Sequence, residues 1–330
     1  MISIFISIFT LCFILFFLYI KISSKLKIID IPNNLNVHKN KIPTGAGIIF
    51  LLNFYFFLII YKFYIPLDFF LLQKNLLVLI ISVTSLCLIS FYDDIYEVHP
   101  IIRLFFQVIL IFFCTSLFHL ELLPLPTKIS MFLIIYFWVY VINIINFTDG
   151  VDGFLGVNAL TFFTSIFLYF EFINNKGFIY YTSFIMIPLL LAYLCFNKPH
   201  AKVFMGDTGS IFIGFIVGFI SIQTVLLGGF EVIIPLLAYT CIDCTLTLAN
   251  KILKKQYPWA RLFDYYFLIP IKNKFSHKKV FVANCIYNLC IITIILLQIK
   301  FNIKYLYLLS IVLAMSLLLY FRSFQRFKIK

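Results

Sequence analysis

Three short motifs of carboxylates, amides and glycines have the chemistry to handle a phosphate together with a divalent cation. The first is the adjacent pair Asp93 and Asp94, in the segment Phe-Tyr-Asp-Asp-Ile-Tyr-Glu. Two neighbouring carboxylates repel each other, which is unfavourable unless they share a cation or a proton. The alternative is a pair of helix-end acids in water, and this motif alone does not decide between the two.

The second motif is Asn-Ile-Ile-Asn-Phe-Thr-Asp-Gly-Val-Asp-Gly, residues 143–153. Asn143, Asn146 and Gly150 recur at intervals of three and four, so they share one helical face. A polar face at the end of an apolar helix must look into a protein cavity, because lipid cannot satisfy its hydrogen bonds. The alternative is a capped helix end with a glycine turn, which the two Asp-Gly units at Asp149 and Asp152 disfavour.

The third motif is Phe-Met-Gly-Asp-Thr-Gly-Ser, residues 204–210, directly before an apolar segment. A glycine-rich backbone that opens a helix, with Ser210 as its cap, forms a site for a phosphate. Asp207 adds a hard oxygen ligand of the kind that Mg²⁺ prefers. The motif is not a Walker A loop, because the Gly-Lys-Ser/Thr ending is missing. A plain helix cap is the alternative.

Two further segments bring cations near these acids. Residues 38–47 include Lys39 and a Thr44-Gly-Ala-Gly turn, and the loop 251–279 is basic, aromatic and contains His277. Asp243 lies in the apolar segment before that loop, where a carboxylate is unfavourable and usually has a purpose. Neither a Ser-His-Asp arrangement nor zinc-spaced histidines are evident. The chemistry that fits is phosphoryl transfer, in which a metal ion and positioning do most of the work.

The composition places the elements that carry these motifs in a membrane. The 330 residues are 63% hydrophobic and only 12% charged, whereas soluble domains are about 25% charged. We therefore expect an all-α, polytopic helix bundle in which residues 1–330 form a single transmembrane catalytic domain. The net charge of +13 is better explained by basic cytoplasmic loops than by nucleic-acid binding, so we expect no nucleic-acid partner.

Apolar runs predict about 10–11 transmembrane helices, because a spanning helix needs roughly 20 apolar residues. The segments are 1–20, 45–65, 74–92, 102–119, 129–146, 156–173, 178–196, 210–226, 230–250, 280–299 and 303–321. Alternate loops hold 20 of the 26 Lys and Arg residues, which predicts a cytoplasmic location for those loops. They lie near 21–44, 92–102, 147–156, 197–209 and 251–279. The N-terminus is then outside, the C-terminus is cytoplasmic, and all three motifs face the cytoplasm.

The motifs together resemble the polyprenyl-phosphate N-acetylhexosamine-1-phosphate transferase family, over roughly residues 38–280. The resemblance rests on Asp93-Asp94, on the run from Asn143 to Gly153 and on residues 205–210. It implies an Mg²⁺-dependent enzyme, with Mn²⁺ as an alternative ion, in the inner (plasma) membrane. The enzyme would transfer a sugar-1-phosphate from a UDP-sugar to undecaprenyl phosphate, release UMP and initiate a cell-surface glycan. A homodimer is a candidate assembly, and the surrounding lipid is a further partner.

The resemblance also implies roles for individual residues. Asp93, Asp94 and Asp207 would be catalytic, with Asp93 and Asp94 at the lipid phosphate, and Asp207 and Asp152 would be the metal ligands. The substrate-binding set would be Lys39, Thr44, Asn143, Asn146, Asp149, Asp152 and His277.

One departure concerns the histidines of the loop before the last spans. The peptidoglycan enzyme of the family has three consecutive histidines there, whereas this chain has only His277, followed by two lysines. This favours the branch that initiates O-antigen or teichoic-acid synthesis over the phospho-MurNAc-pentapeptide translocase, which is kept as an alternative. A membrane transporter is the second alternative, disfavoured because transporters place polar sites near the midplane between repeats.

Overall fold

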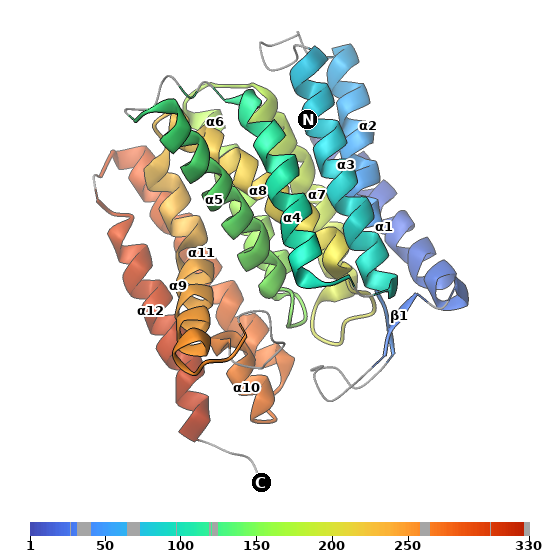
Figure 1. Ribbon diagram of the computed structural model, residues 1–330, viewed down its shortest axis with the longest axis vertical. Coiled ribbons are helices and arrows are strands. Elements are labelled where there is room, and N and C mark those ends of the chain that lie inside the picture. The colour runs from blue at the N-terminus through green and yellow to red at the C-terminus, as the bar shows by residue number, and fades with distance from the viewer. Residues whose placement is uncertain are drawn as a thin grey trace.

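The computed structural model describes the chain apart from residues 27, 32–40, 65–72, 97, 119, 121–124, 258–264, 304 and 327–330. The described part is helical except for one pair of two-residue strands, β1 (Ile29–Asp30) and β2 (Ile42–Pro43), which are antiparallel with Ile29 opposite Pro43. The predicted all-α membrane bundle is confirmed (Figure 1).

Each predicted apolar segment coincides with a helix. The long helices are α1 (Ile2–Leu26), α2 (Ile48–Tyr64), α3 (Gln73–Tyr96), α4 (Pro100–Cys114), α5 (Thr127–Phe147), α6 (Phe154–Phe172), α7 (Phe178–Asn197), α8 (Gly206–Leu226), α9 (Phe230–Leu253), α11 (His277–Phe301) and α12 (Leu308–Ser323). Within the described residues, nine helices are long and apolar enough to cross a membrane. The apolar parts of α2 (Ile48–Ile60) and α12 (Leu308–Ser323) are shorter. The strand pair and the four-residue helix α10 (Ile269–Lys272) are elements that the apolar pattern did not predict.

Helix α8 is the centre of the bundle. Of its most apolar stretch 83% is buried, against 17% for α1 at the periphery. Glycines let α5 approach it closely: a Cβ at Gly214 would lie 2.8 Å from Ile142 Cα, and small residues allow such contacts between membrane helices. Trp138 of α5 packs against Gly218 and donates its indole N–H to the Phe215 carbonyl oxygen at 2.9 Å. The helix that begins with the third motif is therefore rigidly packed.

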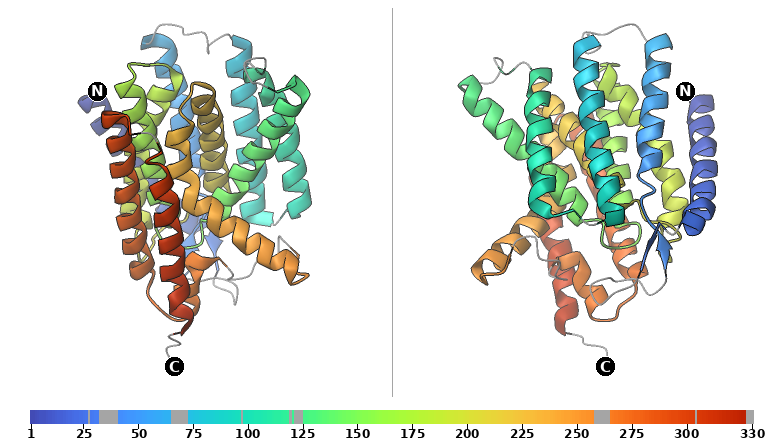
Figure 2. Two further views of the ribbon diagram at one scale, coloured as in Figure 1. Left: turned by 90° about the vertical axis from the view of Figure 1, so that its left-hand side faces the viewer. Right: turned by 45° about the vertical axis from the view of Figure 1, so that its right-hand side comes forward.

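The successive helices run up and down, so their connections gather at two ends of the bundle. The connections α1–α2, α3–α4, α5–α6, α7–α8 and α9–α11 lie at the lower end in Figure 1, with α10 and the strand pair. These are the connections in which the sequence places the acids and most of the basic residues. The last turns of α9 run outward from the bundle at the same end (Figure 2, left).

Candidate active site

The carboxylate of Asp94 caps the N-terminus of α8. Its Oδ1 accepts the backbone N–H of Asp207 at 2.8 Å, and its Oδ2 accepts both the N–H and the hydroxyl of Thr208, at 3.2 and 2.7 Å. The first N–H groups of a helix have no partner within it, and they carry partial positive charge that favours an anion. An acid from the C-terminal end of α3 thus binds where the sequence suggested a phosphate.

Gly206 allows this contact. Its φ is +69°, which L side chains rarely adopt, and a Cβ there would lie 2.5 Å from Asp94 Oδ2. The expectation that Ser210 caps the helix is wrong. The Ser210 hydroxyl donates to Asn146 Oδ1 at 2.9 Å and lies 3.1 Å from the Gly206 carbonyl oxygen. Ser210 is one turn inside the helix, so it joins α8 to the Asn motif of α5.

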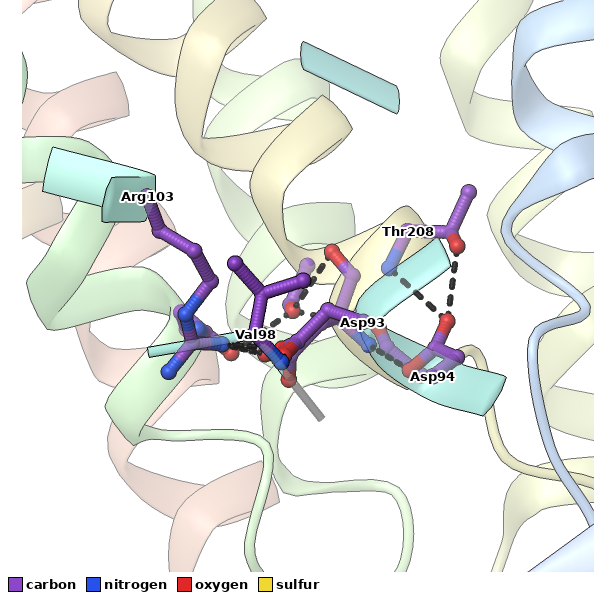
Figure 3. Close-up of polar contacts among 9 residues, drawn as sticks. Asp93, Asp94, Val98, Arg103 and Thr208 are labelled. Atoms are coloured by element: carbon purple, nitrogen blue, oxygen red, sulfur yellow. Dashed lines mark hydrogen bonds and ion pairs between the residues drawn. The ribbon is translucent and has the colours of Figure 1, made fainter. Parts of the chain in front are cut away.

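Arg103 lies between two acids. One guanidinium nitrogen, Nη1, is paired with both Asp93 Oδ2 and Asp207 Oδ2. Asp93 is in the last turn of α3 and has a side chain only 6% exposed. Asp207 is in the first turn of α8, and Arg103 is in the first turn of α4. Figure 3 shows Arg103 reaching across to Asp93, while Asp94 turns the other way toward Thr208. Because the two neighbouring acids point to different partners, their mutual repulsion is reduced.

The segment before α2 also packs on this motif. The N–H groups of Ala46 and Gly47 donate to the carbonyl oxygens of Phe204 and Met205, at 3.2 and 2.9 Å. A Cβ at Gly47 would lie 2.0 Å from the Gly209 nitrogen, so only glycine permits this approach. Thr44 is held nearby, because its carbonyl oxygen accepts the Tyr19 hydroxyl at 2.6 Å. Lys39, predicted in the same segment, lies outside the described residues.

The amide side chains of α5 are used for helix contacts. Asn146 accepts the Ser210 hydroxyl, as described above. Asn143, one turn deeper, donates to Gln107 Oε1 of α4 at 2.7 Å and to the Val139 carbonyl oxygen at 2.8 Å. The predicted shared face of the Asn motif therefore looks into the protein, toward α4 and α8.

Asp149 lies in the turn between α5 and α6 with a half-buried side chain. Burial and the nearby charges of Asp207, Asp94 and Asp152 raise the pKa of its carboxyl to about 8. Within the described part of the chain this carboxylate makes no hydrogen bond or ion pair. It is thus a half-buried acid whose ionised form lacks a compensating partner.

Asp152 is bonded on both oxygens. Its Oδ1 lies 3.2 Å from Nδ1 of His277, the first residue of α11, and its Oδ2 accepts the N–H groups of His200 and Ala201 at 3.1 and 3.2 Å. Burial opposes ionisation, but the His277 contact and these N–H groups outweigh it, so the pKa of Asp152 is below its ordinary value. Asp152 joins the α5–α6 turn, the α7–α8 connection and the start of α11.

Asp243 has a structural role in this arrangement. It is fully buried in α9 and accepts the N–H groups of Tyr266 and Phe267 at 3.0 and 3.3 Å, with the Tyr239 hydroxyl at 2.8 Å. Phe267 in turn stacks on Phe154 at the start of α6, with ring centroids 4.8 Å apart. The acid inside the span therefore attaches the α9–α11 loop to the site.

The side chains at the site that could bind a metal ion favour a cation held jointly by the protein and the substrate. No three His, Cys, Asp or Glu side chains among the described residues are close enough to hold a metal ion. Mg²⁺ does not need such a cage, because it keeps several waters and binds one or two carboxylates together with substrate phosphates. Asp207, with a side chain 25% exposed, fits that role. Asp152 is occupied by three hydrogen-bonding partners, and its role as a metal ligand stays a prediction.

The structure brings together nearly all of the predicted residues that it describes. Asp93, Asp94 and Asp207 meet directly, and Asn143 and Asn146 continue the cluster into the bundle. His277 contacts Asp152, and the two belong to the same end of the bundle. Sequence reasoning did not predict Arg103 as a site residue. It used Arg103 only as one of the basic residues that indicate the orientation of the chain in the membrane. The signal for Arg103 was its position inside an apolar segment, ten residues after Asp93.

Comparison with known proteins places these motifs in a family context. Residues 76–225 match the profile of glycosyl transferase family 4. The chain is 30% identical over 217 residues to the phospho-N-acetylmuramoyl-pentapeptide-transferase of Prochlorococcus marinus subsp. pastoris, covering 58% of each protein. It is 32% identical over 215 residues to that of Petrotoga mobilis, covering 56% of this chain and 62% of the relative.

A relative with a different printed name covers more of the chain. It is the "Probable undecaprenyl-phosphate N-acetylglucosaminyl 1-phosphate transferase" of Bacillus subtilis, 24% identical over 251 residues, 72% of this chain and 67% of the relative. The chain spans less than two thirds of the length of either pentapeptide-transferase. The matched region holds Asp93, Asp94, Arg103, residues 143–153 and Asp207. Residues 76–225 of this polytopic membrane protein thus match the glycosyl transferase family 4 profile, and the matched region carries the cluster of acids.

Proposed function

We propose that the protein transfers a sugar-1-phosphate, N-acetylhexosamine-1-phosphate in our first candidate, from a UDP-sugar to undecaprenyl phosphate. The observation that carries this proposal is the meeting of Asp93, Asp94 and Asp207 around Arg103 at one end of the bundle, inside the family-matched region. The lysine and arginine distribution predicts that this end faces the cytoplasm, where a nucleotide-sugar is available. The product would initiate a surface glycan such as O-antigen or teichoic acid.

The reaction needs no covalent enzyme intermediate. An oxygen of the lipid phosphate attacks the sugar-linked phosphorus, the bond from that phosphorus to the bridging oxygen breaks, and UMP leaves with that oxygen. A bound Mg²⁺, or Mn²⁺ in its place, supplies positive charge to the pyrophosphate. The residues of the chain orient the two phosphates and stabilise their charge, which is most of what catalysis of phosphoryl transfer requires.

The contacts support distinct roles for the three acids. Asp207 is partly exposed and is our candidate for the metal ligand. Asp94 is bonded to the backbone of α8, so we assign it the positioning of Asp207. Asp93, paired with Arg103, is our candidate for the residue that positions the lipid phosphate. A base is not essential, because a phosphate monoester is largely ionised near neutral pH. Thr44, Asn143, Asn146, Asp149, Asp152 and His277, with Lys39, are proposed to line the nucleotide-sugar pocket.

A second candidate has the same chemistry and a larger donor, UDP-MurNAc-pentapeptide. The names of the Prochlorococcus and Petrotoga relatives favour it. The first candidate is favoured by the name of the Bacillus relative and by Ser276-His277-Lys278-Lys279, which stands where the peptidoglycan enzyme has three histidines.

The decisive experiment incubates the purified protein with undecaprenyl phosphate, Mg²⁺ and a panel of UDP-sugars that includes UDP-MurNAc-pentapeptide, and measures UMP. We expect UMP to form only when lipid and Mg²⁺ are both present, and to form fastest with a UDP-N-acetylhexosamine. Fastest release from the pentapeptide donor would select the second candidate. A folded protein that releases UMP from no donor would refute both.

A matched pair of variants links activity to the site. Asp207→Asn removes a carboxylate from the cluster, and we expect at least a roughly 100-fold loss of rate, or about 2.7 kcal/mol. Glu171→Gln removes an exposed acid near the opposite end of the bundle and should leave the rate unchanged. Full activity in Asp207→Asn would show that the metal assignment is wrong.

A further inference from the structure

An apolar groove of about 780 Å³ lies between α11 and α12, on the outside of the bundle. Its walls are Val282, Ala283 and Ile286 of α11 together with Leu313, Leu317 and Tyr320 of α12. Ile286 and Tyr320 are exposed, so the groove opens to the surroundings of the bundle. In a membrane, the chains of lipids surround such a groove.

Two cations stand at one end of this groove. Lys278 and Lys279, in the first turn of α11, are both exposed and both line it. The Lys279 ammonium lies 4.8 Å above the ring of Phe275, and that ring packs against Phe324 with centroids 4.6 Å apart. No acidic side chain is among the described residues that line the groove. Its polar end therefore carries two positive charges, and one of them, Lys279, lies over an aromatic ring.

The start of α11 adds to this positive potential. Ser276 is the N-cap residue, yet its side chain makes no capping hydrogen bond, and the first turn contains no acid. Uncapped N–H groups at a helix N-terminus favour an anion, and a phosphate in particular.

The Tyr287 hydroxyl provides a second polar feature. It is buried, its residue lines the groove, and it has no hydrogen-bond partner among the described residues.

The groove is separate from the cluster of acids. His277, directly before the two lysines, contacts Asp152 on the inner side of α11. Lys278 and Lys279 line the groove on the outer side. A lipid phosphate held by these lysines is therefore on the wrong side of α11 to react at Asp207, so the occupant is not the acceptor substrate.

We propose that this groove binds one anionic phospholipid of the surrounding membrane, with an acyl chain between α11 and α12 and the headgroup phosphate at Lys278 and Lys279. Neutral phospholipids offer the same acyl chain but no net negative charge. Each lysine near an anionic surface contributes about 1 kcal/mol, which is about fivefold. Two lysines together give a preference for the anionic lipid of roughly 25-fold.

Cys290 provides a local probe, because it is exposed and lines the groove. In a variant with Cys195, Cys241 and Cys285 replaced by alanine, a fluorophore on Cys290 reports groove occupancy, since the other cysteines are buried. The protein is reconstituted in phosphatidylcholine vesicles with one added lipid whose acyl chains are brominated. The added lipid is either phosphatidylglycerol or phosphatidylcholine, and its fraction is increased stepwise. We expect brominated phosphatidylglycerol to quench at a roughly 25-fold lower fraction than brominated phosphatidylcholine. Equal quenching by the two lipids would overturn the proposal.

Two controls separate this site from the general basic character of that end of the bundle. Lys278→Gln with Lys279→Gln should make the two lipids quench equally. Lys254→Gln with Lys272→Gln removes the same charge at the same end of the bundle, from residues that do not line the groove, and should retain the preference. Loss of the preference in both pairs would mean that only the general surface charge attracts the lipid. In a second variant, with Cys241, Cys285 and Cys290 replaced by alanine, a fluorophore on Cys195 of α7 should be quenched equally by both lipids.

Discussion

Arg103 is paired with two carboxylates of the site, Asp93 and Asp207. It offers one nitrogen to two carboxylates from helices that are more than a hundred residues apart in the chain. Removing the guanidinium would leave Asp93 and Asp207 facing each other without a cation, and like charges at short range disfavour the ionised forms of both.

We therefore expect Arg103→Gln to slow UMP release by roughly 10- to 100-fold, or about 1.4–2.7 kcal/mol. Arg103→Lys should recover part of the rate, because it restores a positive charge without the planar fork. The measurement is UMP release at saturating donor and lipid. Arg322→Gln, which removes an exposed arginine of α12, serves as the control. If Arg103→Gln released UMP as fast as the control, Arg103 would have no role in the reaction.

Asp149 should make the binding of Mg²⁺ at the site depend on pH. Its pKa of about 8 means that the carboxyl is mostly protonated at pH 7, below that pKa. A cation that binds nearby favours the ionised form, so binding should release a proton near pH 7. The apparent affinity for Mg²⁺ should then rise with pH, by up to about tenfold per unit, and level off above about pH 8.

Proton release on addition of Mg²⁺ to weakly buffered protein at pH 7 measures this coupling. Asp149→Asn should reduce the release and weaken the pH dependence of Mg²⁺ affinity, whereas Glu171→Gln should change neither. The same release from Asp149→Asn and from the unaltered protein would assign the proton to another group.

At the scale of elements, the cap on α8 explains why sequence reasoning named residues that meet in the structure and yet mistook one of their contacts. The residue types of the three motifs are visible in the sequence, and an acid at a helix start is a familiar pattern. The pairing of Asp94 with the α8 backbone depends on how α3 and α8 pack. Local sequence suggested Ser210 instead, because a serine near a helix start is a common cap.

Gly206 and Gly228 allow the role of that cap to be tested. Both have positive φ, +69° and +86°, but a Cβ at Gly206 would meet Asp94, whereas a Cβ at Gly228 would meet nothing within 4 Å. Alanine at either position should destabilise the fold by about 1–2 kcal/mol through backbone strain. Only Gly206→Ala should also displace Asp94 and lower UMP release, by roughly tenfold or more. Equal activity of the two variants, measured with their thermal unfolding, would argue against a positioning role for Asp94.

The helices themselves were predictable because the bilayer imposes length and apolarity on each span. All eleven predicted segments are helices in the structure. The strand pair β1–β2 and the short helix α10 were not predicted, since two and four residues carry no periodic signal. Their positions depend on contacts with distant segments, such as the hydrogen bond from Thr44 N–H to the Ile28 carbonyl oxygen.

At the scale of the whole molecule, the distribution of basic residues predicts that the acids face the cytoplasm. A membrane-impermeant thiol reagent on intact cells can test this prediction. In a Lys278→Cys variant, the new thiol at the same end as the site should react with the reagent only after the cells are opened. Lys176 lies in the exposed α6–α7 connection at the opposite end. In a Lys176→Cys variant, the new thiol should react in intact cells. The reverse pattern would invert the topology and separate the site from cytoplasmic nucleotide-sugars.

The buried carboxylate of Asp243 has a mechanical consequence. It fastens Tyr266 and Phe267 to α9, and Phe267 lies against Phe154 and near Gly150. A tilt of α9 would therefore be transmitted to the turn that carries Asp149. Spanning helices adjust their tilt to the thickness of the hydrocarbon layer, so the proposed activity should be sensitive to bilayer thickness. UMP release from protein in short-chain and long-chain lipids would reveal this sensitivity, and Asp243→Asn should reduce it.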